Sequence, residues 1–192
     1  IDATQPFVVS EYIPGPTLSE LLSRGAINVG GVAAIGGALA QTLQDVHARR
    51  IVHRDVKASN VICSPQGPVL IDFGIAMGQD EARLTQTGLV SGTAGYTAPE
   101  LLKGASASAA TDWWAWTATL LAALTGRPPY GSGVTAAILD RVLKGDPDTD
   151  GLDLSVAQLM RQGLHPDPQL RPNPDHIIRH LAHWGGFPLE KI

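Results

Sequence analysis

The sequence predicts a mainly α-helical fold with one small β-hairpin region. Apolar residues recur at helical spacing over long segments, for example at Ile35, Leu39 and Leu43. Short β-type runs, by contrast, occur only before residue 72. With 192 residues, of which 44% are hydrophobic, the chain is long enough to bury one core.

Short strands are expected near the start of the chain and in one hairpin. Residues 7–12 have the composition of a strand, which the Pro-Gly-Pro run at 14–16 ends. A second short run follows at 51–52. The runs at 61–63 and 69–71 are separated by polar turn residues, so we expect them to pair as a hairpin.

Helices account for most of the remaining chain. Thr17 and Glu20 form a capping box at the start of a short helix. The helix over 30–48 contains four glycines, which lower its intrinsic propensity, so tertiary packing must stabilise it. A polar loop over 75–97 is long enough to be functional. Further helices are expected over 98–103, 112–125, 134–144, 155–163 and 174–183.

Composition excludes several classes of function. The formal net charge of −4 gives no broad electrostatic attraction to nucleic acid or to an anionic membrane. The apolar run over 115–124 is too short to span a bilayer. A single cysteine, Cys63, cannot form an intramolecular disulfide. We therefore expect a cytoplasmic protein, with any membrane anchor of the full-length protein lying outside this segment.

Three motifs carry the chemistry of the chain, in a fixed order. His53-Arg54-Asp55-Val56-Lys57-Ala58-Ser59-Asn60 comes first, followed by Asp72-Phe73-Gly74 and then Ala98-Pro99-Glu100. Each short motif alone is weak evidence, but the order and the gaps together are specific. The set resembles the signature of Hanks-type (eukaryotic-like) Ser/Thr protein kinases. The Ala- and Gly-rich composition resembles bacterial, in particular actinobacterial, members of that family.

This resemblance implies a division of the chain. Residues 1–13 would be the end of a small-lobe strand and the hinge, and 14–192 would be the kinase C-terminal lobe. That lobe would contain a catalytic loop at 53–60 and an activation segment at 72–100. The glycine-rich loop and strand lysine of the family do not occur in this sequence, so the small β-rich lobe is expected to be missing. We expect the isolated chain to be inactive, with the missing lobe and self-association through the exposed N-terminal strand as candidate contacts.

The resemblance also assigns roles in phosphoryl transfer from ATP to a Ser or Thr of a protein substrate. Asp55 would be the catalytic base, and Lys57 would contact the γ-phosphate, as is typical of Ser/Thr kinases rather than Tyr kinases. Asp72 and Asn60 would bind Mg²⁺ (or Mn²⁺), hard cations that prefer oxygen ligands. Five residues separate Asp55 from Asn60, so one short loop can direct both side chains into the same cleft.

Nucleotide binding would involve the hinge as well as the catalytic loop. Ser10 would be a small gatekeeper, and the backbone of Glu11 and Ile13 would meet the adenine. Ile62 would form the floor of the adenine pocket, and Thr17 would lie near the ribose. At the phosphate end the resemblance implies Lys57, Asn60 and Asp72.

Further residues would support this site. Thr93 would bond to Asp55 and Lys57, Glu100 would pair with Arg171, and Asp112 would hold the backbone of the catalytic loop. The complete set of supporting residues is His53, Arg54, Thr93, Glu100, Asp112 and Arg171.

Two threonines of the long loop, Thr85 and Thr87, are the expected sites of activating phosphorylation. Arg54 precedes the catalytic aspartate, and a guanidinium binds a phosphate through two parallel hydrogen bonds. Such a pair would order the loop.

Two other classes of function compete with a protein kinase. A pseudokinase-like regulatory or scaffold module is disfavoured because Asp55, Asn60 and Asp72 are all present. A small-molecule phosphotransferase of related fold is disfavoured by the Ala98-Pro99-Glu100 motif and the peptide-docking segment before it.

Overall fold

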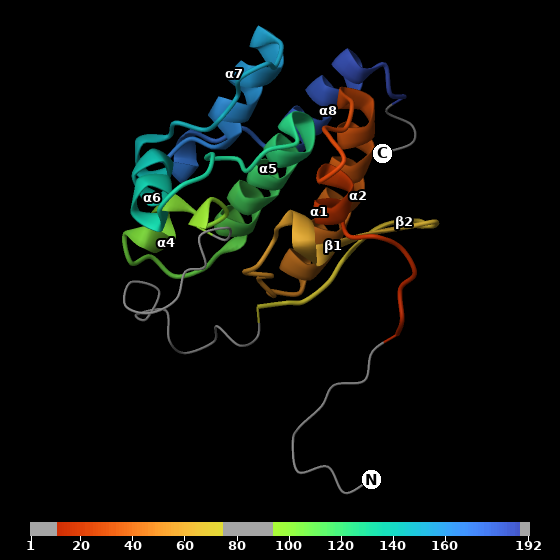
Figure 1. The fold of residues 1–192 in the computed structure, drawn as a ribbon. Coiled ribbons are helices and arrows are strands. Elements are labelled where there is room, and N and C mark those ends of the chain that lie inside the picture. The colour runs from red at the N-terminus through yellow and green to blue at the C-terminus, as the bar shows by residue number, and fades with distance from the viewer. Residues whose placement is uncertain (1–10, 75–93, 189–192) are drawn as a thin grey trace, which may run out of the picture.

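The computed structural model describes residues 11–74 and 94–188, and it confirms a mainly helical architecture (Figure 1). A single two-stranded sheet is present among these residues. No helix in the described part of the chain is both long and apolar enough to cross a membrane. The elements in chain order are α1 (Leu18–Leu22), α2 (Val29–Ala48), the 3₁₀ turn η1 (Ala58–Asn60), β1 (Val61–Ser64), β2 (Gly67–Leu70), α4 (Pro99–Leu102), α5 (Ala109–Thr125), α6 (Thr135–Lys144), α7 (Leu154–Gly163), the 3₁₀ turn η4 (Pro168–Leu170) and α8 (Pro174–Gly185).

Helix α5 is the centre of the fold. Every residue from Trp114 to Leu124 is buried, because α2 and α7 pack against it on different sides. The indole of Trp116 donates a hydrogen bond to the carbonyl oxygen of Gly36 in α2 at 3.1 Å, so a polar group in the core is satisfied. Gly126 ends α5 in the left-handed conformation with φ of 67°.

The glycines of α2 explain how a helix of weak propensity is stabilised. A β-carbon at Gly30 would lie 2.8 Å from the carbonyl oxygen of Gly185, the last residue of α8. A β-carbon at Gly36 would lie 3.1 Å from the side chain of Leu120 in α5. The absence of side chains therefore lets α2 approach the backbone of α8 and the core face of α5.

The expected hairpin forms, with Val61 opposite Leu70 and Ser64 opposite Gly67. The segment before α1 lies along β1 of this hairpin, because the amide of Cys63 donates a hydrogen bond to the carbonyl oxygen of Pro16 at 2.8 Å. The predicted strand at 51–52 is wrong. Arg50 takes a left-handed conformation (φ 60°) and the amide of Ile51 donates to Val46 at 3.0 Å, so these residues close α2 instead. Residues 11 and 12 are not in a strand either, and 7–10 lie outside the described residues.

A buried ion pair fastens α4 to the segment before α8. Arg171 donates to both carboxylate oxygens of Glu100, at 2.8 and 2.7 Å, and the two side chains are 6% and 15% exposed. The guanidinium also donates to the carbonyl oxygens of His165 and Ala110, at 2.8 and 3.2 Å. This is the pairing that the sequence led us to expect.

Loss of this pair should be costly. We predict that Arg171→Gln lowers the free energy of unfolding by about 3–5 kcal/mol, because it leaves the Glu100 carboxylate buried and unpaired. Arg127→Gln is the matched control: Arg127 also binds both oxygens of one carboxylate, that of Asp148, but its side chain is 43% exposed. We expect that control to cost about 0–1 kcal/mol. Urea unfolding of both variants would measure this, and equal losses would contradict the prediction.

The contact between α2 and α8 gives a second prediction. Gly185→Ala should lower the free energy of unfolding by about 1–3 kcal/mol, because the new methyl group would overlap the backbone of Gly30. Gly95→Ala adds the same methyl group where the nearest atom, of Pro129, is 3.5 Å away, and should have little effect. Thermal unfolding of the two variants would compare them. A Gly185→Ala protein as stable as Gly95→Ala would show that the helices can separate without loss.

Candidate active site

One buried carboxylate holds the loop that follows α2. Asp112, in the first turn of α5, is 1% exposed. Its Oδ2 accepts a hydrogen bond from the amide of His53, and its Oδ1 accepts one from the amide of Arg54, both at 2.8 Å. Both oxygens of this buried carboxylate thus accept a short hydrogen bond from the backbone. They fix the peptide that immediately precedes Asp55.

The Asp112 carboxylate also accepts a hydrogen bond from His47, a residue that was not predicted from the sequence. Nε2 of His47, near the end of α2, lies 2.8 Å from Oδ2 of Asp112. Its ring also contacts Trp113 edge-on, with centroids 5.4 Å apart. In the sequence His47 is only one polar residue in the last turn of an amphipathic helix, so no local signal distinguishes it.

Arg54 has an unfavourable backbone conformation, with φ of 72°. A left-handed conformation costs a residue other than glycine roughly 1–2 kcal/mol. It allows the amides of His53 and Arg54 to meet the two oxygens of Asp112. The buried carboxylate therefore stabilises a turn that the local sequence alone would not favour.

Asp55, Lys57 and Asn60 lie within hydrogen-bond distance of one another. The ammonium group of Lys57 is 2.8 Å from Oδ2 of Asp55. Nδ2 of Asn60 donates to the same oxygen and to the Asp55 carbonyl, both at 2.8 Å. Asn60 is buried, whereas the side chains of Lys57 and Asp55 are about one quarter exposed, at 22% and 25%. One carboxylate is thus held by two donors and remains open to solvent.

Asp72 is placed beside this group by contacts of its neighbours. The amide of Ile71 donates to the carbonyl of Asn60, and the amide of Gly74 donates to the carbonyl of His53, both at 2.9 Å. The Phe73 ring contacts the His53 ring with centroids 4.6 Å apart. The segment that contains Asp72 is therefore attached to both ends of the loop at 53–60.

His53 is the buried contact between these two segments. It is fully buried, and burial lowers the pKa of its imidazole below the ordinary value, although nearby carboxylates oppose this shift. Its Nε2 has no hydrogen-bond partner within the described residues. We infer that His53 packs as a neutral ring at neutral pH.

Asp72 and Asn60 each offer an oxygen atom of the kind that a hard divalent cation prefers. Asp72 is exposed in a left-handed conformation (φ 57°), and its carboxylate has no hydrogen-bond or ion-pair partner among the described residues. Asn60 uses its amide nitrogen to bind Asp55, which directs its Oδ1 away from that carboxylate. No group of three His, Cys, Asp or Glu side chains in the described ranges could hold a metal. Two oxygen donors suit Mg²⁺, which usually takes its remaining ligands from phosphates and water.

The predicted nucleotide residues are only partly accounted for. Thr17 and Ile62 form an isolated antiparallel bridge, so these two are adjacent. Glu11 is exposed and Ile13 is half-buried in the segment leading to α1. Ser10, predicted at the adenine, lies outside the described part of the chain. So do the predicted phosphorylation sites Thr85 and Thr87 and the predicted supporting residue Thr93.

Comparison with known proteins identifies the family. The chain matches the model for the protein kinase domain over residues 2–182. It is 34% identical over 182 residues to the serine/threonine-protein kinase AfsK of Streptomyces coelicolor, which covers 94% of this chain and 23% of that kinase. It is also 34% identical over 169 residues to the serine/threonine-protein kinase PknA of Mycobacterium tuberculosis, covering 86% of this chain and 39% of PknA.

The chain therefore spans between about a quarter and two fifths of the length of these curated relatives. The predicted resemblance to bacterial Hanks-type kinases is confirmed, because the matches come from actinobacteria and cover nearly the whole chain. This chain belongs to the protein kinase domain family.

Proposed function

We propose that this chain is the C-terminal lobe of a kinase that transfers the γ-phosphate of ATP to a Ser or Thr of a protein substrate. The main support for the proposal is the arrangement around the Asp55 carboxylate, which is 2.8 Å from both the Lys57 ammonium and the Asn60 amide nitrogen. The backbone of the same loop is held by the buried carboxylate of Asp112. The relatives AfsK and PknA, both named as serine/threonine-protein kinases, support the same activity.

In this mechanism Asp55 accepts a hydrogen bond from the acceptor hydroxyl and takes its proton as the new O–P bond forms. The bond between the γ-phosphorus and the β–γ bridging oxygen of ATP breaks in the same step, and ADP is the leaving group. Asn60 keeps the carboxylate oriented through its amide, and Lys57 balances negative charge on the transferred phosphate. A divalent cation held by Asn60 and Asp72 would neutralise phosphate oxygens when bound with ATP. The presence of Asp55, Asn60 and Asp72 disfavours the alternative, a pseudokinase-like regulatory or scaffold module.

The nucleotide site requires more than the described residues. We propose that residues up to Ile13 form the hinge, with Ser10, Glu11 and Ile13 at the adenine and the Thr17–Ile62 bridge below it. The glycine-rich loop and lysine that cover ATP phosphates in protein kinases would come from an N-terminal lobe of the same protein.

The catalytic roles can be tested by substitution in a form of the protein that includes an N-terminal kinase lobe. Asp55→Asn should lower phosphate transfer to a protein substrate at least about a hundredfold while ATP still binds, because only the base is lost. Asp72→Ala should lower transfer similarly and also weaken binding of Mg-ATP. Radiolabelled phosphate transfer and nucleotide titration would measure the two effects.

The matched control for this experiment is Asp140→Asn. Asp140 is an exposed aspartate on α6 that pairs with Lys144 at 2.7 Å, far along the chain from the catalytic loop. Its substitution should leave transfer unchanged. Near-normal turnover of both Asp55→Asn and Asp72→Ala would overturn the proposed function.

We also propose that phosphorylation of Thr85 and Thr87 activates the enzyme. The Arg54 side chain is exposed and has no hydrogen-bond or ion-pair partner in the described residues, so it is free to bind a phosphate. Mass spectrometry of the active protein should find phosphate on one or both threonines, and Thr85→Ala/Thr87→Ala should reduce activity. Full activity of that double variant, together with no phosphate on either residue in the wild type, would refute the idea.

A further inference from the structure

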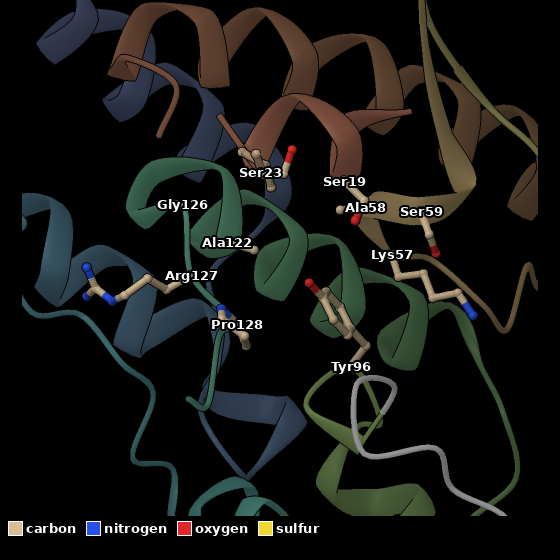
Figure 2. A pocket seen from close by; sticks show the side chains of 11 residues that line it. Ser19, Ser23, Lys57, Ala58, Ser59, Tyr96, Ala122, Gly126, Arg127 and Pro128 are labelled. Carbon is tan, nitrogen blue, oxygen red and sulfur yellow. The ribbon is translucent and has the colours of Figure 1, made fainter. Parts of the chain in front are cut away.

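A hollow of about 430 Å³ opens beside the catalytic loop (Figure 2). One wall is α1, and the opposite wall consists of the end of α5 and the turn after it. Lys57 lies at its edge, and the ammonium group of this residue is 2.8 Å from the Asp55 carboxylate. An acceptor hydroxyl at Asp55 would therefore place neighbouring residues of a bound peptide, each spanning about 3.3–3.6 Å of chain, within reach of the hollow.

The lining of the hollow is apolar with a rim of hydroxyl groups. Leu22, Ala122 and Pro128 supply apolar surface. Ser19 from α1 and Ser59 from η1, both exposed, supply hydroxyl groups on the same side of the hollow (Figure 2). Such a lining suits a side chain that is uncharged.

Tyr96 adds a neutral hydroxyl group to this lining. Its side chain extends into the space between α1 and α5 (Figure 2), and no described residue hydrogen-bonds its hydroxyl. Burial raises the pKa of Tyr96 to about 12, so the phenol stays protonated and is not an anion at physiological pH. It offers a hydrogen bond but no charge.

No carboxylate is found among the described residues that line the hollow. The acidic residue of α1, Glu20, is used in the capping box, where its Oε2 accepts from the amide of Thr17 at 2.7 Å. The guanidinium of Arg127 points away from the hollow (Figure 2) and is bound by Asp148 at 2.9 and 2.8 Å. The ammonium group of Lys57 points away from Tyr96 and Ala122 (Figure 2) and is 2.8 Å from the Asp55 carboxylate.

We propose that this hollow receives an uncharged side chain of the protein substrate and selects against Lys and Arg near the phosphorylated residue. A basic side chain would lose water on entry and would find no carboxylate among the described residues that line the hollow, which is unfavourable. An apolar side chain would instead contact Leu22 and Ala122, and a hydroxyl side chain could also accept a hydrogen bond from the Tyr96 hydroxyl. The inference rests on the proposed kinase function and adds the class of substrate sequence.

The test uses the protein with its N-terminal kinase lobe and peptides with one Ser acceptor, in which each flanking position is in turn Leu, Ser, Glu or Arg. For the wild type we expect at least one position at which kcat/KM for Leu or Ser exceeds that for Arg about tenfold or more. That position identifies the residue in the hollow.

Ser19→Glu and Ser59→Glu, tested separately, then place a carboxylate at the rim. Either variant should shift the Leu-to-Arg ratio at that same position toward Arg by roughly tenfold, since a hydrogen bond to a charged group contributes about 1.5–3 kcal/mol. A ratio measured on one enzyme cancels any general loss of turnover. Ser106→Glu adds the same charge at an exposed serine outside the hollow and should shift no position.

The outcomes separate the two proposals. The wild type could phosphorylate peptides but prefer Arg at the position that both variants affect. This result would overturn the inference about the hollow and leave the proposed kinase function intact. The inference would also be overturned if the Leu-to-Arg ratio of kcat/KM changed in neither variant, or if it changed by the same factor in Ser106→Glu. Failure of the wild type to phosphorylate any peptide or protein would overturn the proposed kinase function, and this inference with it.

Discussion

The geometry of the catalytic loop depends on the buried carboxylate of one aspartate. Asp112 has almost no contact with water, and it binds two consecutive backbone amides and one imidazole. A buried carboxylate is tolerated only when its oxygens are satisfied in this way. Because α5 is surrounded by the core, the carboxylate cannot move to follow the loop. The loop must take the conformation that the carboxylate imposes, including the strained backbone of Arg54.

The hydrogen bonds of Asp112 also determine the positions of the candidate catalytic residues that follow in the chain. Fixing His53 and Arg54 also fixes the next residue, Asp55, whose carboxylate then meets Lys57 and Asn60. The carbonyl of His53 holds Gly74, and the carbonyl of Asn60 holds Ile71. Asp72 lies between these two bonds, so its position depends on the same support. A rigid site thus results from a short series of backbone contacts.

The sequence predicted most elements of this fold because their signals are local. Helix capping at Thr17 and the hydrophobic spacing of 30–48 need only neighbouring residues, and the spacing of Asp55 and Asn60 is a property of one loop. The strand predicted at 51–52 failed because the left-handed Arg50 follows α2, and nothing in its side chain indicates that conformation. His47 was missed because its partner, Asp112, is 65 residues away. Long-range contacts of this kind can be found only when the helices are placed in space.

The close contact of Gly30 with Gly185 also determines where the two ends of α2 lie in the molecule. With 20 residues, α2 is about 30 Å long. Its first turn touches the end of α8, and its last turn carries His47 to the catalytic loop (Figure 1). The helix therefore works as a spacer of fixed length between the exit of α8 and the chemistry. A fluorescent protein or affinity tag joined after α8 would be held about one helix length from Asp55, where it would leave the approach of a substrate open.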